Sequence, residues 1–361
     1  MSVSTIFILT TDPGLEPILE QEWTQRTSAY NIDSPVVWHK FKGMKGVVMI
    51  ESHASLEVLL PILEQMRSVH HAYRLLHQGK LDVAQPVQHI QQTVQQLEIS
   101  EMEAANSFRV TVSRIGDQVF SSYDIAVASG AAIQAHYGTA VNLEEYDVNI
   151  RVDVVRDSWW TGVQLYHKAL SNRFVRALHH NVSLKPTIAY GLLRLAGITQ
   201  DDQGPLLDPF CGSGTLLMEA AQVFPQLKII GSDIFPEPIE TSQQNIAQNL
   251  QHPERIQLHM ADARRLSESF EPNSIKYIVT NPPYGIRVGK NLRFYWFYYH
   301  FLDQAHQVMQ EDGRLVLLVL RVQFFRDAMR KLGLWHVQWS QKIELGGKRV
   351  KAYVLSKSRP Q

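Results

Sequence analysis

The chain has 361 residues, with 35 lysines and arginines against 35 aspartates and glutamates, one cysteine and 45% hydrophobic residues. This length allows two or three domains with full cores. A single cysteine excludes an intramolecular disulfide and a multi-thiolate metal site, and the histidines lack metal-motif spacing, so we expect no metal. No apolar run approaches the roughly 20 residues of a membrane span, and the N-terminus lacks the basic front of a signal peptide. We therefore expect a cytoplasmic protein with no membrane partner.

The neutral total conceals an uneven distribution of charge. Residues 1–157 contain 11 basic and 19 acidic residues (net −8), and residues 158–361 contain 24 basic and 16 acidic residues (net +8). Two stretches of the second half, 158–200 and 272–302, have no acidic residue. Two such gaps favour a binding surface for an anion over plain solvated faces.

The first 168 residues indicate two small α+β units. In residues 1–72 we expect strands at 4–9, 36–38 and 46–50, and helices from Leu15 and over 56–66. In residues 73–168 we expect helices at 85–98 and 125–135, and strands from Ser107 and over 148–155 and 159–165. Residues 169–184 are interpreted as a linker.

Residues 185–361 alternate between helix and strand. The predicted helices are 187–196, 215–223, 238–249, 297–309 and 324–332, and the predicted strands are 205–208, 228–232, 256–260, 275–280, 314–320, 335–343 and 348–356. Alternation of this kind predicts a parallel sheet, and the last two strands add an antiparallel hairpin. The predicted fold class is α/β.

A glycine-rich turn after the first of these strands is the sharpest motif. The segment Asp208-Pro209-Phe210-Cys211-Gly212-Ser213-Gly214-Thr215 leads from a strand into a helix, and glycines there let a ligand approach the backbone. A nicotinamide site is excluded because the third glycine of its motif would fall at Leu217 and because the leading acid would repel a pyrophosphate. The acid suits the amino group of a methionine-like cofactor.

Three further strand ends carry polar residues. Asp233 follows the second strand and can accept hydrogen bonds from a ribose diol, and Asp262 follows the third and suits an adenine amine. Asn281-Pro282-Pro283-Tyr284 follows the fourth. Ligands of open α/β sheets lie beyond the carboxyl ends of the strands, so these clusters should converge on one cleft.

Together these motifs resemble class I S-adenosylmethionine-dependent methyltransferases, in particular the group that methylates exocyclic amines through Asn-Pro-Pro-Tyr. The resemblance implies a Rossmann-like domain with a seven-stranded, mostly parallel sheet over residues 185–361. It implies S-adenosyl-L-methionine as cofactor. The cofactor contacts it implies are Thr187, Asp208, Phe210, Gly212, Gly214, Thr215, Asp233, Ile234, Asp262, Ala263 and Asn281.

The catalytic residues that follow from this resemblance are Asn281, Pro282 and Tyr284. An exocyclic amine is a poor nucleophile because its lone pair is delocalised into the ring. The Asn281 side-chain oxygen and the Pro282 carbonyl would accept its protons and localise that pair, and Tyr284 would stack on an extruded base. Positioning supplies much of the acceleration, so no strong general base is expected.

The N-terminal half bears on the substrate. The segments 107–114, 120–122, 125–135 and 141–143 resemble a THUMP domain, and Thr10-Thr11-Asp12-Pro13-Gly14-Leu15-Glu16 is similar to the opening of the ferredoxin-like domain that precedes it. This arrangement resembles the TrmN-type enzymes, which implies N2 methylation of a guanosine at position 6 in the tRNA acceptor stem. The alternatives are guanine-N2 methylation of large-subunit ribosomal RNA, a DNA or protein amine methyltransferase, and a non-enzymatic RNA-binding module.

Basic residues of the two acid-free stretches are the candidate RNA contacts. They are Lys168, Arg173, Arg176, Arg287, Lys290 and Arg293. The last three lie beside Phe294, Tyr295, Trp296 and Tyr298, which can stack on bases or form a buried helix face. Because the N-terminal half is acidic, we expect few phosphate contacts and a modest salt dependence of tRNA binding. We expect a monomer.

Overall fold

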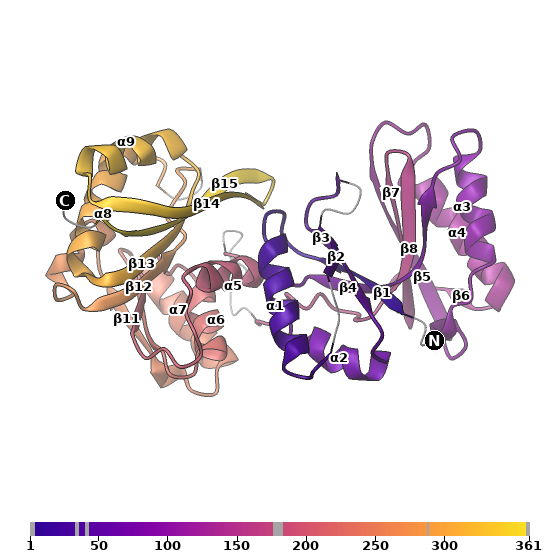
Figure 1. The fold of residues 1–361 in the computed structure, drawn as a ribbon, viewed down its shortest axis with the longest axis horizontal. Helices are drawn as coiled ribbons and strands as arrows, with labels where there is room; N and C mark the ends of the chain where they lie inside the picture. The colour runs from indigo at the N-terminus through magenta and orange to yellow at the C-terminus, as the bar shows by residue number, and fades with distance from the viewer. Residues whose placement is uncertain (1–3, 33–35, 40–42, 176–182, 287–288, 359–361) are drawn as a thin grey trace. The chain divides into compact units, whose positions relative to one another are not determined.

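The computed structural model describes residues 4–32, 36–39, 43–175, 183–286 and 289–358, and it divides into two compact units (Figure 1). The N-terminal unit contains Met1–Thr11 and Leu19–Leu170, and the C-terminal unit contains Asp12–Ile18 and Ser171–Gln361. The short segment 12–18 therefore belongs with the C-terminal unit, although the chain around it belongs to the other. Among the described residues, no helix combines the length and the apolar character needed to cross a membrane.

The N-terminal unit is built on one eight-stranded sheet in the order β2-β3-β1-β4-β8-β7-β5-β6. Its strands are β1 (Thr5–Thr10), β2 (Val36–His39), β3 (Val47–Ser52), β4 (His71–Lys80), β5 (Ser107–Ile115), β6 (Ala140–Val141), β7 (Val148–Val155) and β8 (Ser158–Gln164). Its helices are α1 (Glu16–Ser28, whose first residues lie in the C-terminal unit), α2 (Leu56–Glu64), α3 (Pro86–Gln95) and α4 (Ser122–Tyr137).

Alternating residues of this sheet form the cores beneath the helices. Trp23 of α1 and Leu59 of α2 pack against Phe7 and Leu9 of β1, while Ile8 between them faces the opposite side. Helices α3 and α4 pack over β5, β7 and β8, where Phe108 and Trp159 are fully buried. Successive side chains of a strand point to opposite faces of the sheet. Each pair of helices, α1 with α2 and α3 with α4, therefore packs on every second residue of the strands beneath it.

The C-terminal unit contains a seven-stranded sheet in the order β11-β10-β9-β12-β13-β15-β14. Its strands are β9 (Pro205–Asp208), β10 (Lys228–Asp233), β11 (Ile256–Met260), β12 (Ile275–Thr280), β13 (Met309–Val319), β14 (Trp335–Leu345) and β15 (Lys348–Lys357), and its helices are α5 (Pro186–Leu195), α6 (Thr215–Val223), α7 (Pro236–Asn249), α8 (Phe294–Val308) and α9 (Val322–Leu332). The first five strands are parallel, and the β14–β15 hairpin is antiparallel. This confirms the predicted sheet.

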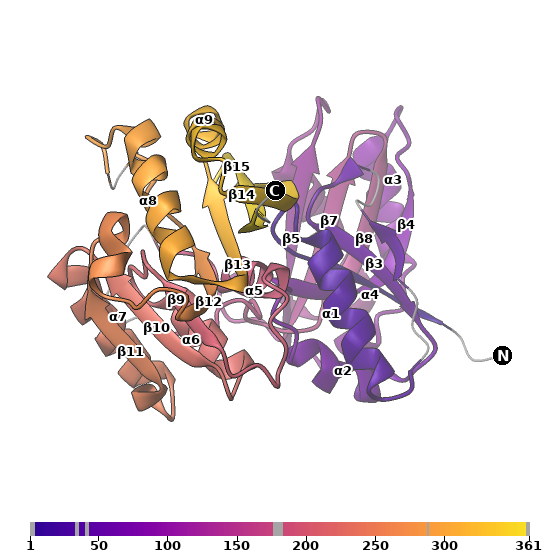
Figure 2. The same ribbon diagram turned by 60° about the vertical axis from the view of Figure 1, so that its left-hand side comes forward.

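Both faces of this sheet are covered by helices (Figure 2). Leu206 and Val279 pack in the core with α5 and α6, whereas their neighbours Leu207 and Ile278 pack in the core with α8 and α9. A parallel sheet buried on both faces needs apolar residues at consecutive positions, and β9, β12 and β13 have them. Polar side chains that bind a ligand must therefore lie at the ends of these strands.

Strand β4 differs from expectation. It covers residues 71–80, where we expected a unit boundary at 72/73 and no strand. It pairs with β1 on one side and with β8 on the other, so it joins the two expected α+β parts in one sheet. The division of this unit into ferredoxin-like and THUMP parts stays a prediction.

Candidate active site

The carboxyl ends of four neighbouring parallel strands bring together the predicted polar residues. Asp208 ends β9, Asp233 ends β10, and Asp262 and Asn281 follow β11 and β12. The register aligns Gly231 of β10 with Asp208, and Asp233 with Met260 of β11. The four side chains therefore lie along one edge of the sheet, which is where an open α/β fold binds its ligand.

Asp208 is the most deeply buried of these acids, with 3% of its surface exposed. Thr280 Oγ1 donates a hydrogen bond to its Oδ1 at 2.6 Å, and the Phe210 amide donates to the same oxygen at 3.1 Å. Burial raises the pKa of the carboxyl to about 7, only partly offset by these two bonds. A bound cation would favour the ionised form, so the site suits an amino group.

The glycine-rich turn has the conformation that its sequence predicts. Gly212 (φ +53°) and Gly214 (φ +79°) occupy the left-handed region. A Cβ built on Gly212 would project into open space, with Phe210 O as its nearest neighbour at 3.9 Å, whereas one on Gly214 would meet Ser242 Oγ at 3.0 Å. The first glycine thus keeps space free for a ligand and the second permits close packing on α7. These features fit a cofactor lying against the turn.

Asp233 lies beside this turn. Its carboxylate accepts hydrogen bonds from the amides of Gly212 and Phe235, both at 3.3 Å. Burial raises the pKa of the carboxyl above its usual range, and these amides oppose the shift. The carboxylate is thus fixed at the end of β10, and Ile234 next to it is 42% exposed. The bond from Asp233 to a ribose diol stays a prediction.

Asp262 is paired with an arginine. Arg264 donates to both carboxylate oxygens, with the shortest contact from Nη2 to Oδ2 at 2.6 Å. Burial alone would raise the pKa of Asp262, but the bonds from Arg264 outweigh it and hold the pKa below its usual range. An ionised carboxylate has about four acceptor positions, so an adenine amine can still be accommodated. Ala263, also predicted as a contact, is buried.

Asn281 and Tyr284 form a pair within the Asn-Pro-Pro-Tyr motif. The Tyr284 hydroxyl donates a short hydrogen bond to Asn281 Oδ1. The Tyr284 ring packs against the core beneath α5 and α6, and burial raises its pKa, so the phenol stays protonated. Pro282 is buried. An amide oxygen has two lone pairs, so Asn281 Oδ1 can also accept from a substrate amine; stacking of Tyr284 on a base stays a prediction.

Thr187 contacts the N-terminal segment. Its hydroxyl donates to Asp12 Oδ2 at 2.5 Å, and Lys185 Nζ donates to Asp12 Oδ1 at 2.7 Å. Both Thr187 and Asp12 are buried. The expected cofactor contact of Thr187 stays a prediction, and the structure shows that its hydroxyl is bonded to protein. Of the other predicted contacts, Thr215 begins α6 and Phe210 packs on Phe297 of α8.

The predicted RNA-contact residues differ in their surroundings. Lys168, Lys290 and Arg293 are exposed, and Arg176 and Arg287 lie outside the described residues. The RNA contact of Arg173 stays a prediction, and the structure shows that its guanidinium donates two bonds of 3.0 Å to the fully buried Glu219, with 15% of the side chain exposed. A buried carboxylate needs such a counterion, so Arg173 stabilises Glu219 in the fold.

Three polar residues that support the site were missed. On α7, Ser242 donates to the Gly212 carbonyl at 2.8 Å and Asn245 donates to the Ser213 carbonyl at 3.0 Å. Both are buried and fix the turn from below. Their i, i+3 spacing on one helix face was a usable signal. The third, Asp12, lies 173 positions from Lys185 and gave no local signal.

Comparison with known proteins gives consistent matches over both units. Residues 173–351 match the family described as RMKL-like, methyltransferase domain, and residues 84–160 match the THUMP domain. The tRNA (guanine(6)-N2)-methyltransferase of Thermus thermophilus is 31% identical over 351 residues, covering 96% of this chain and 98% of that protein. An enzyme of the same name from Methanocaldococcus jannaschii is 28% identical and covers 69% of this chain and 76% of its own length.

Solved structures agree. The crystal structure of TrmN from Thermus thermophilus superposes with a TM-score of 0.81 at 29% identity, over 98% of this chain and all of that chain. A candidate methyltransferase in complex with SAH has a TM-score of 0.78 at 17% identity over all of both chains, which shows a shared fold.

The sheet order, the glycine turn and the acidic strand ends define a class I S-adenosylmethionine-dependent methyltransferase. The THUMP match and the similarity along almost the whole chain make it more specific. This chain belongs to the family of THUMP-containing methyltransferases that includes TrmN.

Proposed function

We propose that the protein transfers a methyl group from S-adenosyl-L-methionine to the exocyclic N2 amine of a guanosine in tRNA, at position 6 of the acceptor stem. The observation that carries the proposal is the hydrogen bond from Tyr284 to Asn281 at the carboxyl end of β12. Strand β12 pairs with β9, and Thr280 of β12 donates a hydrogen bond to Asp208 at the end of β9. The tRNA substrate is supported by the THUMP domain and by the names of both relatives.

In this proposal the acidic strand ends hold the cofactor. Asp208 would bind the amino group of its methionine part, Asp233 would accept from the ribose diol, and Asp262 with the Ala263 amide would bind the adenine. When bound, S-adenosylmethionine supplies a methyl group on an electron-poor sulfonium. The glycine turn keeps side chains away from it.

Asn281 and Pro282 then orient the acceptor. Their oxygens accept the two N–H groups of the guanine amine, so its lone pair is aimed at the methyl carbon. In the transfer, a new N–C bond would replace the S–C bond of the bound cofactor, and the electron pair of the S–C bond would stay on sulfur. The surplus proton leaves the nitrogen for water after transfer, so the site needs no strong base.

The experiment that tests the proposed class of substrate is transfer of labelled methyl groups. Unmodified tRNA, large-subunit ribosomal RNA, duplex DNA and total protein are offered in parallel at equal mass. We expect label in tRNA, and label in ribosomal RNA or DNA alone would overturn the choice. We also propose that the enzyme is cytoplasmic and monomeric. Light scattering of the purified protein measures its molar mass and so tests the oligomeric state.

A further inference from the structure

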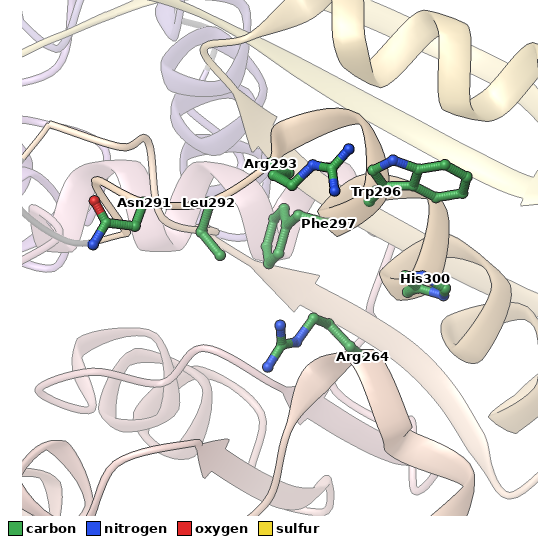
Figure 3. Close-up of a pocket in the computed structure, with 7 residues that line it drawn as sticks. All are labelled: Arg264, Asn291, Leu292, Arg293, Trp296, Phe297 and His300. Atoms are coloured by element: carbon green, nitrogen blue, oxygen red, sulfur yellow. The ribbon is translucent and has the colours of Figure 1, made fainter.

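A pocket of about 430 Å³ lies at the start of α8 (Figure 3). Its volume falls within the roughly 300–1,000 Å³ of small-molecule sites. Leu292 and Phe297 supply apolar walls, and Arg264, Arg293, Trp296 and His300 supply polar and aromatic ones. Asn281 and Tyr284 do not line it, so it is distinct from the proposed amine site.

The pocket has two arginines. Arg264 comes from the segment after β11 and Arg293 from the loop before α8, and they lie on opposite sides of the Phe297 ring in Figure 3. Arg264 is bonded to Asp262, but Arg293 is exposed and has no carboxylate partner among the residues described. The pocket therefore carries excess positive charge suited to an anion.

The pocket also has an exposed aromatic surface. Trp296 is 46% exposed, and its ring stacks with that of His300 at a centroid distance of 6.0 Å and an interplanar angle of 25°. A stacked, half-exposed indole beside the exposed guanidinium of Arg293 matches the two parts of a nucleotide, a base with a π-face and a phosphate.

The charge argues against the cofactor as occupant. S-adenosylmethionine has its one carboxylate at the methionine end, and its adenosine end carries no negative charge. The arginines would therefore have no anionic partner on an adenosine in this pocket, whereas each nucleotide of an RNA strand supplies a phosphate.

We propose that this pocket is a subsite for an RNA nucleotide that flanks the target guanosine, with Arg293 on its phosphate and Trp296 on its base. The proposal rests on the proposed function, since the RNA is the substrate. Arg264 also holds Asp262, so a change there would disturb the cofactor site as well. The test therefore uses Arg293 and Trp296.

The experiment compares Arg293→Ala, Trp296→Ala and Trp296→Phe with the unaltered enzyme. The KM for tRNA should rise about 5- to 150-fold in Trp296→Ala, as loss of a stacked base predicts. Trp296→Phe should recover most of this loss. Arg293→Ala should raise the KM for tRNA. It should also make the plot of log association constant for tRNA against log salt concentration shallower by about one, the amount expected for one lost phosphate contact, whereas Trp296→Ala should leave this slope unchanged.

Two controls make the outcome decisive. Arg330→Ala removes an arginine that is 77% exposed on α9 and should leave KM unchanged. Calorimetry without RNA should give the same cofactor Kd for all variants. Unchanged KM in both Arg293→Ala and Trp296→Ala would overturn the proposal, and an equal loss of cofactor affinity would assign the pocket to the cofactor. If the unaltered enzyme methylates no tRNA, the proposed function fails on its own, and RNA binding by fluorescence anisotropy still tests the pocket.

Discussion

Asp208 combines deep burial with a proposed role that depends on its charge. Its pKa of about 7 means that a large share of the free enzyme holds this carboxyl protonated at neutral pH. Binding of a cationic amino group requires the ionised form. We therefore expect the cofactor Kd to rise about tenfold for each pH unit below 7. It should rise again above about pH 8, where the free amino group of the cofactor loses its proton. Calorimetry between pH 5.5 and 8.5 measures this dependence.

The matched control is Asp208→Asn, which keeps an oxygen to accept from Thr280. It should bind cofactor more weakly at pH 8, and its remaining affinity should lack the dependence below pH 7. The folded pKa is raised, so the stability that this carboxyl contributes is present at low pH and lost as pH rises through about 7. The variant should therefore be at least as stable as the unaltered protein at pH 8. A flat Kd profile for the unaltered enzyme would contradict the role of Asp208.

Asn281 and Tyr284 should differ in their effects on catalysis. Asn281→Ala removes the proposed acceptor of the substrate amine and should lower kcat by about 100-fold or more, as loss of a transition-state hydrogen-bond partner does elsewhere. Tyr284→Phe removes only the hydroxyl that holds Asn281 and should lower kcat by about tenfold or less. Calorimetry should show cofactor binding largely intact in both. Full loss of cofactor affinity in Asn281→Ala would refute its assignment to the amine.

Among the elements, the segment 12–18 has a role out of proportion to its length. Asp12 accepts from Lys185 and Thr187 at the start of α5, Gln341 of β14 donates to the Gly14 carbonyl, and the Glu344 amide donates to the Pro13 carbonyl. Leu15 packs in the core beneath α5 and α6. The segment thus ties α5 to the terminal hairpin within the C-terminal unit.

Removal of this tie should destabilise the C-terminal unit. Asp12→Ala leaves the buried Thr187 hydroxyl without its acceptor, which costs about 1–3 kcal/mol. Asp12→Asn keeps an acceptor for Thr187 and should cost less, because the partly exposed Lys185 is readily solvated. Urea unfolding monitored by circular dichroism measures both. Equal stability of Asp12→Ala and the unaltered protein would show that the segment is dispensable.

Some helices and strands could be predicted from the sequence, and others could not. Strands β9, β11 and β12 and helix α6 begin and end where predicted. For β9 and β12 the local signals are an apolar run and the Asp-Pro or Asn-Pro turn at its end. Strand β4 was missed because His71, Arg74 and His77 interrupt its apolar pattern, and its conformation depends on pairing with β1 and β8. The Arg173–Glu219 pair was missed because its partners are 46 residues apart.

At the scale of the whole molecule, the opposed charges of the two halves limit how strongly RNA binding can depend on salt. Exposed cations of the predicted set, such as Lys168, Lys290 and Arg293, supply few phosphate contacts. For three or four phosphate contacts, the slope of log association constant for tRNA against log salt concentration should be about −3. Fluorescence anisotropy of labelled tRNA between 50 and 300 mM salt measures it. A slope steeper than about −6 would reveal a basic surface that these residues do not explain.

Methylation of the guanine N2 amine in tRNA can be detected by mass spectrometry of nucleosides. An unmodified tRNA transcript is incubated with the enzyme and S-adenosylmethionine, digested to nucleosides, and mapped by fragmentation of nuclease products. We predict N2-methylguanosine at position 6, absent when Asn281→Ala replaces the unaltered enzyme. A methylated adenosine or cytidine, or a methyl group on another atom of guanosine, would show that the enzyme is not a guanine-N2 methyltransferase.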